Sequence, residues 1–326
     1  MRIITSLLLI VIWVACGPIQ EQTETKKITT TSLVVLGNVQ DAGSPHIACK
    51  KACCAALFKK PDPTRKVASL GLIIPESKET YLFEATPDMP MQMKMLNEIA
   101  PFEHQETPDG IFLTHAHIGH YAGLMYLGKE AMNADSVRVF VAKNMKTYLE
   151  QNGPWSQLVN NSNVSLIRIG EKGCKSICPV LNNSRNVDST ISVKPIRVPH
   201  RDEYSETVCQ KISTPKKKVL FIPDIDKWEK WNADIIEEIK KVDYAFLDGT
   251  FYDGNELPGR DIKQIPHPFV IESMELFKDL SKKDKAKIHF IHFNHTNPLL
   301  NKNSKEYKEV IKRGFNIANY GDVFEL

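Results

Sequence analysis

The sequence lacks the features that mark several common classes of protein. Its 326 residues carry a formal net charge of only +3, and no basic run is interleaved with aromatic side chains, so nucleic-acid binding is not expected. After residue 16, no apolar run is long enough to cross a membrane. Gly-x-Ser-x-Gly, the P-loop and Gly-x-Gly-x-x-Gly are all missing, so neither serine hydrolysis nor a nucleotide-phosphate cradle is supported. The composition, 42% hydrophobic and 25% charged, is that of a globular protein with a sizeable core.

The first sixteen residues, MRIITSLLLIVIWVAC, differ from the rest of the chain. One Arg precedes an apolar stretch from Ile3 to Ala15, which is short for a membrane span and is placed as a secretion signal is. The stretch ends in Ala15-Cys16-Gly17, which resembles a bacterial lipoprotein box. We therefore predict a signal peptide over residues 1–16 and a lipidated Cys16, so that the exported protein is anchored to a bacterial membrane and faces the periplasm or the cell surface. Ordinary secretion with cleavage nearby is the alternative.

The remainder of the chain predicts a short tether followed by one α/β domain. Residues 17–31 are polar and have no apolar periodicity, as a surface tether would. No linker or repeat divides residues 32–326, in which apolar, β-branched runs alternate with helical periodicity. This order predicts two sheets packed face to face with helices outside. The expected strands are 32–37, 67–75, 81–85, 110–114, 137–142, 164–169, 191–198, 218–223, 244–249 and 287–293, and the expected helices are 91–100, 120–132, 228–241 and 268–280.

Apart from Cys16, the chain has six cysteines: Cys49, Cys53, Cys54, Cys174, Cys178 and Cys209. An even number permits disulfides in an oxidising compartment, and the pair at 174 and 178 would close a small loop. The first three form the compact run CKKACC just after His46. They would be free or disulfide-bonded, or they would form a small zinc site, because thiolates near an imidazole suit that metal.

Three histidines fall within six positions in the stretch FLTHAHIGHYAGL. His115 and His117 lie two apart just beyond a predicted strand, so both rings can point the same way, and His120 begins the next helix. The small residues Gly119 and Gly123 would let the backbone approach closely. Imidazole is the commonest metal ligand in proteins, and a metal site needs several ligands held by a fixed backbone. The cluster therefore predicts a metal centre rather than unrelated packing histidines.

Further candidates follow later predicted strands. His200 ends ISVKPIRVPH, Asp224 ends KVLFIPD, and His295 comes just after KIHFIHF. Any one of them alone would be taken for a cap, turn or packing residue. Layered α/β proteins gather their sites at the carboxyl ends of strands, so their recurrence there predicts that they join the histidine cluster.

Together these motifs resemble the metallo-β-lactamase superfamily of metal-dependent hydrolases. Its signature is His-x-His-x-Asp-His followed by a distant His, an Asp and a final His. Within the superfamily the chain is most similar to the pyrroloquinoline quinone biosynthesis protein B group, in stretches such as QDAGSPHIAC, LTHAHIGHYAGL and FIPDID. The resemblance covers essentially the whole domain. It implies an αββα sandwich with a site at one edge of the two sheets for one or two Zn²⁺ ions, with iron or manganese as alternatives.

The resemblance also assigns ligands residue by residue. His115, His117 and His200 would hold a first metal; Asp224 would bridge to a second; His120 and His295 would complete the second site; and Asp224 and His295 would be catalytic. Gly119 stands where the family has an Asp. The site would then be mononuclear, or binuclear with an acid borrowed from one of the turn residues Asp41, Asp88, Asp202 and Asp248. Of these, Asp88 is expected to anchor loop amides beneath the histidines rather than to bind metal.

Substrate contacts are expected from three loops. Arg201 and Tyr204 follow His200 directly, whereas Asp248 and His267 belong to the stretches LDGTFY and IPHPF. Arg201 would pair with an anionic substrate group or, equally, with an acid of its own loop.

The function implied by these features is metal-dependent hydrolysis. A bound metal lowers the pKa of water and polarises a carbonyl or phosphoryl oxygen. We therefore predict an enzyme that directs metal-bound hydroxide at a small-molecule ester, phosphodiester, lactone or lactam. The alternatives are an iron-dependent oxygenase, which some relatives of the quinone-biosynthesis group resemble, and a non-catalytic lipid-anchored binding protein. The retained histidines favour the hydrolase.

Overall fold

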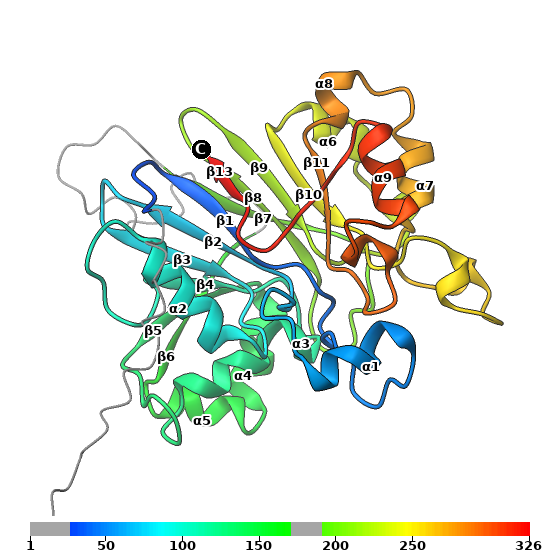
Figure 1. Ribbon diagram of the computed structural model, residues 1–326. Coiled ribbons are helices and arrows are strands. Elements are labelled where there is room, and N and C mark those ends of the chain that lie inside the picture. Colours follow the sequence, from blue (N-terminus) through cyan, green and yellow to red (C-terminus); the bar gives the residue numbers. More distant parts are fainter. Residues whose placement is uncertain (1–26, 171–190) are drawn as a thin grey trace, which may run out of the picture.

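The computed structural model describes residues 27–170 and 191–326, which form an αββα sandwich (Figure 1). Two sheets pack against each other in the middle, and helices cover both outer faces. The predicted signal peptide with Cys16, and the pair Cys174 and Cys178, lie outside the described residues. In the described part, no helix is both long and apolar enough to cross a membrane.

The first sheet has seven strands in the order β13-β1-β2-β3-β4-β5-β6. Neighbouring strands are antiparallel from β13 to β3 and parallel from β3 to β6. The strands are β1 (Ser32–Gly37), β2 (Ser69–Ile74), β3 (Glu79–Phe83), β4 (Gly110–Phe112), β5 (Val137–Val141), β6 (Val164–Arg168) and β13 (Val323–Glu325).

The second sheet has six strands in the order β12-β11-β10-β9-β8-β7. It is parallel from β12 to β9 and antiparallel from β9 to β7. The strands are β7 (Ser192–Arg197), β8 (Val208–Ser213), β9 (Lys218–Ile222), β10 (Tyr244–Asp248), β11 (Ile288–Ile291) and β12 (Asn316–Ile317).

The helices α2, α4 and α5 cover the outer face of the first sheet, and α6, α7 and α9 cover that of the second (Figure 1). The helices are α1 (Ala52–Lys59), α2 (Met89–Ile99), α3 (Ile118–Tyr121), α4 (Lys143–Gln151), α5 (Trp155–Asn160), α6 (Ile235–Lys240), α7 (Val270–Leu276), α8 (Lys282–Lys285) and α9 (Lys305–Lys312).

The alternation of side chains along β1 shows why its whole run is apolar. Leu33 and Val35 pack in the cluster between the two sheets, whereas Val34 and Leu36 pack in the cluster beneath the outer helices. Successive side chains of a strand point to opposite faces, and here both faces are covered, so every residue of β1 is buried. Full burial of such a side chain stabilises the fold by about 2 kcal/mol.

The αββα architecture expected from the sequence is confirmed, and the main differences concern the helices. The predicted helix 120–132 is broken up: after α3 the chain continues as a 3₁₀ turn, Ala122–Leu127. A Cβ on Gly123 would come 2.2 Å from the carbonyl oxygen of Thr86, so the backbone is drawn against that loop instead of continuing a free helix. The predicted helix 228–241 begins late, as α6, because the Asp234 side chain accepts from the amides of Ile236 and Glu237 and caps it.

Candidate metal centre

The candidate ligands lie where strands end, at one edge of the two sheets. His115 follows β4, His200 follows β7 and Asp224 follows β9. One residue was missed by the sequence analysis: His292, which directly follows β11. The structure thus brings these side chains together at strand ends and adds a fourth strand, β11, which is followed by His292, a residue that the apolar run 287–293 places inside a strand.

A single carboxylate oxygen is the meeting point of four imidazoles. Asp224 Oδ2 lies 3.2 Å from His200 Nε2, 3.5 Å from His115 Nε2, 3.8 Å from His120 Nε2 and 3.9 Å from His117 Nδ1. Ligand atoms of Asp224, His115, His117 and His200 all lie within 4.8 Å of one another. Three nitrogens and one oxygen converging at this separation are a donor set that suits Zn²⁺.

Several buried imidazole nitrogens of the centre lack a hydrogen-bond partner among the described residues, which favours a bound group that accepts their lone pairs. Nε2 of His115, of His120 and of His292 is buried, and none of the three has a hydrogen-bond partner among the described residues. Buried polar atoms in proteins are nearly always paired, so three such nitrogens at one edge of the sheets need partners that the described residues do not supply. A metal ion fits that requirement.

Neighbouring side chains fix the orientation of two imidazoles in the first set. His115 Nδ1 lies 2.8 Å from Thr114 Oγ1, which leaves Nε2 directed at Asp224. His117 Nε2 is held 3.0 Å from the half-exposed Glu203, so its Nδ1 faces the centre. Partners of this kind set the tautomer and the ring angle of metal-binding histidines.

Asp224 is itself held in place by a buried histidine. His267 Nδ1 donates to Asp248 Oδ2 at 2.9 Å and lies 3.1 Å from Asp224 Oδ1. Although burial opposes its charged form, the Asp248 and Asp224 carboxylates raise the pKa of His267 to about 10. Burial likewise opposes ionisation of Asp224, but His200 and His267 hold the pKa of that carboxyl well below its usual value. Asp224 is therefore an anion whose Oδ2 is left to the four imidazoles.

A second ligand set adjoins the first. Ligand atoms of Asp41, His120 and His292 lie within 4.8 Å of one another. His292 is oriented by a relay: Thr250 Oγ1 donates to Asp248 Oδ1 at 2.7 Å and lies 2.9 Å from His292 Nδ1. The single hydroxyl proton of Thr250 is used by Asp248, so Thr250 must accept from His292 Nδ1–H. The lone pair of His292 is thereby placed on Nε2.

We call the whole group the histidine centre: His115, His117, His120, His200, His292, Asp41 and Asp224. One member of the centre and one of its neighbours adopt the left-handed backbone region: His292 after β11 has a φ of +69°, and Glu84 after β3 has a φ of +74°. Glu84 Oε1 lies 3.7 Å from His120 Nδ1. Such conformations cost about 1–3 kcal/mol each and concentrate at functional sites, which supports a functional role for this edge of the sheets.

The structure places His292, not His295, beside His120. The chain turns sharply after Phe293, with the Asn294 amide donating to Thr250 O and the Asn297 amide donating to Asn294 O, so His295 is carried away from Asp224. Sequence spacing did not separate the two histidines of HFNH. The end of β11 does, because His292 follows the strand directly, whereas His295 lies beyond the turn that begins after Phe293.

His295 instead completes a second group, which we call the cysteine cluster: Cys49, Cys53, Cys54 and His295. Their ligand atoms lie within 4.8 Å of one another. The His46 amide donates to Cys54 Sγ at 3.3 Å, and the His46 ring lies 4.3 Å from that of His295. The described cysteines, these three and Cys209, are all free. Of the alternatives open from the sequence, the geometry favours a site with three thiolates and one imidazole, which is a set typical of structural zinc.

The remaining sequence candidates lie outside both groups. Asp88 accepts from the Val67 amide at 2.8 Å, so it anchors a loop as expected, although no contact with the histidines is recorded among the described residues. Arg201 lies 3.6 Å from Glu203, which is the ion pair within the loop. Tyr204 is exposed, with its ring 5.3 Å from that of Tyr148.

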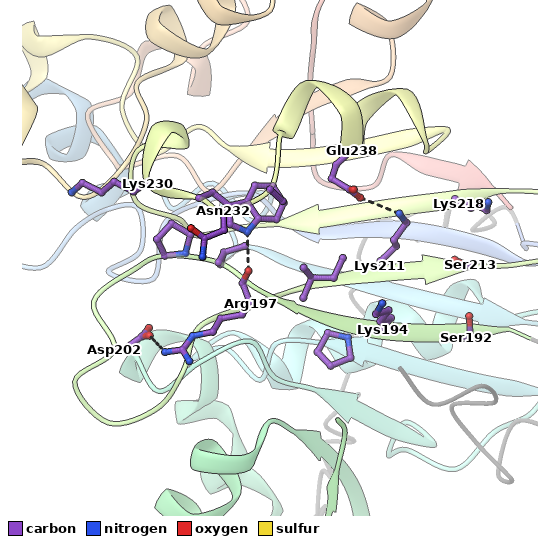
Figure 2. Close-up of a pocket in the computed structure, with 16 residues that line it drawn as sticks. Ser192, Lys194, Arg197, Asp202, Lys211, Ser213, Lys218, Lys230, Asn232 and Glu238 are labelled. Carbon is purple, nitrogen blue, oxygen red and sulfur yellow. Dashed lines mark hydrogen bonds and ion pairs between the residues drawn. The ribbon is translucent and has the colours of Figure 1, made fainter. Parts of the chain in front are cut away.

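A cavity of about 900 Å³ lies apart from the histidine centre. It lies along β7 and β8, where Arg197 pairs with Asp202 and Lys211 pairs with Glu238 (Figure 2). No member of either group of ligands lines it among the described residues. Its size therefore says nothing about the chemistry of the centre.

Comparisons with known proteins agree with this architecture. The model of a family described as a beta-lactamase superfamily domain matches residues 79–290. Coenzyme PQQ synthesis protein B of Gluconobacter oxydans (strain 621H) is 24% identical over 323 residues, 90% of this chain and 98% of that protein. The structure of Zn²⁺-bound PqqB from Methylobacterium extorquens has a TM-score of 0.72 at 20% identity and covers 90% of this chain and 100% of its own. A diphosphatase of the PhnP family has a TM-score of 0.62 at 18% identity, over 91% and 97% of the two chains.

Proposed function

Because the chain belongs to the beta-lactamase superfamily, we propose that it is a metal-dependent hydrolase whose reaction takes place at the histidine centre. The observation that carries the proposal is the convergence of four imidazoles on one oxygen of a buried, ionised carboxylate, Asp224. A metal bound there would lower the pKa of water and polarise a carbonyl or phosphoryl oxygen.

The chain's own residues would hold and orient the reacting groups. His115, His117, His200 and Asp224 are the ligands of the first metal in this proposal. Glu203 keeps the His117 ring turned toward Asp224, and His267 holds the other oxygen of Asp224 so that the carboxylate does not rotate. Burial of His115 and Asp224 excludes bulk water, which strengthens every electrostatic interaction in the centre.

We propose Zn²⁺ as the metal and a small-molecule ester, phosphodiester, lactone or lactam as the substrate. Support for Zn²⁺ comes from the nitrogen-rich donor set and from the relative whose structure is described as Zn²⁺-bound PqqB. Support for hydrolysis of a phosphate linkage comes from the relative described as a diphosphatase. The oxygenase alternative requires iron instead, so metal analysis separates the two.

The test combines metal content with turnover. Elemental analysis of the purified chain, then removal of metal with a chelator and its return, should give hydrolysis of a phosphodiester or ester probe that depends on Zn²⁺. His117→Ala should lose most of this activity, whereas His104→Ala should not, because His104 pairs with Asp109 outside the centre. Iron as the native metal, with no Zn²⁺-dependent hydrolysis of any probe, would contradict the proposal.

We further propose that the protein is a lipoprotein anchored through Cys16. Support comes from the sequence alone: an apolar stretch after one Arg, ending in Ala15-Cys16-Gly17, followed by a polar segment. Cys16→Ala should move the protein into the soluble fraction or leave it unprocessed. If this variant fractionates with membranes as the parent does, the lipoprotein assignment is wrong.

A further inference from the structure

Position 119 is a glycine because its side-chain space is already filled. A Cβ built on Gly119 would lie 2.0 Å from Asp41 Cβ and 2.9 Å from Asp41 Cγ. Real Cβ atoms do not approach other atoms so closely, so no larger residue fits while Asp41 stays in place. The φ angle of Gly119 is not in the left-handed region, so the reason for glycine here is space and not backbone conformation.

The backbone fixes Asp41 at this point. The chain beyond β1 runs alongside the chain beyond β11: the Phe293 amide donates to Asn38 O, and the Gln40 amide donates to Phe293 O, both at 2.8 Å. Asp41 therefore follows directly from a segment that is paired with the neighbour of His292. The segment between β1 and α1, drawn in blue in Figure 1, passes beside α3, which carries Gly119 and His120.

The carboxylate of Asp41 is oriented and lies within reach of two imidazoles. The Gln40 side-chain amide donates to Asp41 Oδ1. A carboxylate oxygen of Asp41 lies within 4.8 Å of the ligand nitrogens of His120 and His292, the same two whose Nε2 atoms have no hydrogen-bond partner among the described residues. One carboxylate and two imidazoles, next to Asp224, form a ligand set for a divalent cation.

We propose that Asp41 supplies the carboxylate ligand of a second metal ion, which His120 and His292 also hold, and that Gly119 is retained to make room for it. The carboxylate that the helix could have carried at position 119 thus comes from a loop 78 positions earlier in the chain. This inference deepens the proposed hydrolase and rests on it, because the second ion would share Asp224 with the first.

The test measures binding of Zn²⁺ alone, by competition with a chromophoric chelator on the whole chain. Asp41→Asn keeps the size of the side chain and removes its charge. The variant should lose one Zn²⁺ equivalent or bind it about 100-fold or more weakly. Loss of a residue that only hydrogen-bonds to a metal ligand already lowers metal affinity about 10–100-fold, and loss of a ligand should cost at least as much. Asp62→Asn is the matched control: Asp62 accepts from Thr64 in an exposed loop and should leave binding unchanged. Protection of thiols from alkylation reports the cysteine cluster separately.

An exchange of the two residues makes the test decisive. Gly119→Asp alone should clash with Asp41 and lose the second Zn²⁺, whereas Asp41→Gly combined with Gly119→Asp should regain it. If Gly119→Asp alone does not fold, the double variant and Asp41→Asn still decide the question. Wild-type affinity in Asp41→Asn, or a double variant that binds no better than Asp41→Gly, would overturn this inference and leave the first metal site intact. Absence of any Zn²⁺ outside the cysteine cluster in the wild type would overturn the proposed function as well.

Discussion

The histidine centre and the cysteine cluster both take residues from the segment after β1 and from the loop after β11, but they differ in what holds their side chains in place. The histidine centre is assembled at the ends of buried strands, and although burial opposes ionisation of its key carboxylate, Asp224, the neighbouring His200 and His267 hold the pKa of that carboxyl well below its usual value. The cysteine cluster lies at the start of α1, in a surface segment. Burial, together with the neighbouring Cys54, raises the pKa of Cys53 to about 12, so this thiol carries its proton until a cation replaces it.

The two groups should depend on metal in different ways. Most members of the histidine centre stand at the ends of strands that the sheets already hold in place, so we expect a metal there to serve chemistry rather than folding. The cysteine cluster joins the loop after β1 to the loop after β11, and these loops also carry Asp41 and His292. Metal in the cysteine cluster would therefore serve geometry, by holding together the two loops that complete the second site of the histidine centre.

The largest effect should come from Asp224→Asn. This change removes the charge on which four imidazoles converge. Hydrolysis should fall about 1000-fold or more, because a bound metal lowers the activation barrier by several kcal/mol. If alkylation shows that the thiols of the cysteine cluster stay protected in the same variant, the cluster keeps its metal independently of the histidine centre. Loss of metal from the histidine centre and from the cysteine cluster together would show that the two groups are not independent.

Next in size should be Cys53→Ser. The cluster should lose its metal and the Tm should fall by about 5 °C or more, because structural zinc contributes directly to folding. Zn²⁺ should also bind more weakly at Asp41, since the loop is no longer clamped. Cys209→Ala is the matched control, because Cys209 is a free buried cysteine in β8 and outside the cluster. An unchanged Tm and metal content in Cys53→Ser would show that the cysteine cluster does not bind a structural metal.

The two histidines of HFNH allow a reciprocal test. His292→Ala should weaken Zn²⁺ binding at the histidine centre by about 100-fold and leave the thiols protected, whereas His295→Ala should expose the thiols and leave the first metal site in place. The measurement is Zn²⁺ competition together with alkylation of the cysteines in both variants. If His295→Ala abolishes hydrolysis while the thiols stay protected, His295 belongs to the centre after all.

A smaller effect is expected from Thr250→Val. The variant keeps the shape of Thr250 but breaks the relay from Asp248 to His292, so the proton of His292 is no longer confined to Nδ1. Zn²⁺ affinity at the second site should fall by about 10–100-fold, with the cysteine cluster unaffected. An equal loss of Zn²⁺ affinity at the second site and at the cysteine cluster would mean that the substitution disturbs β10 and β11 in general, and not the contact with His292 alone.

The remaining effect depends on pH and concerns β11, the strand that leads to both groups. Burial lowers the pKa of His289 to about 4, from 6.5. Between pH 6.5 and about pH 4, His289 is protonated in the unfolded chain but not in the folded chain. The free energy of unfolding therefore decreases as the pH falls through this range, by about 3 kcal/mol in total. His289→Phe, which keeps the packing against Phe246 and Phe324, should lose less stability between pH 7.5 and 4.5 in urea unfolding. An equal loss in both chains would exclude His289 as the cause.

The sequence predicted most of the fold because apolar runs reveal strands that are covered on both faces. It missed β8, VCQKIS, in which the adjacent polar residues Gln210 and Lys211 interrupt the apolar pattern, and the short β12 and β13. Helices such as α4 and α9 were missed because their polar faces outweigh their apolar stripes, with buried residues reduced to Met145 and Leu149 in α4 and to Val310 in α9.

The histidine centre was predictable where ligands cluster in sequence and not where they meet only in space. His115, His117 and His120 stand in one motif, and Asp224 ends an apolar run. The meeting of Asp41 with Gly119 depends on the pairing of the chain after β1 with that after β11, which no local pattern encodes. The apolar run 287–293 extends two residues beyond the end of β11, so the pattern places His292 inside the strand and leaves His295 as the first histidine after it.

The contact between Asp41 and Gly119 also constrains how this centre can change over evolutionary time. Neither position can be altered alone: an acid at 119 collides with Asp41, and loss of Asp41 leaves the second ligand set without its carboxylate. Relatives that carry the acid on the helix should therefore have a small residue where this chain has Asp41, and the reverse. A lineage moving between the two arrangements must pass through a form with one metal, so the two arrangements should mark separate branches of the family.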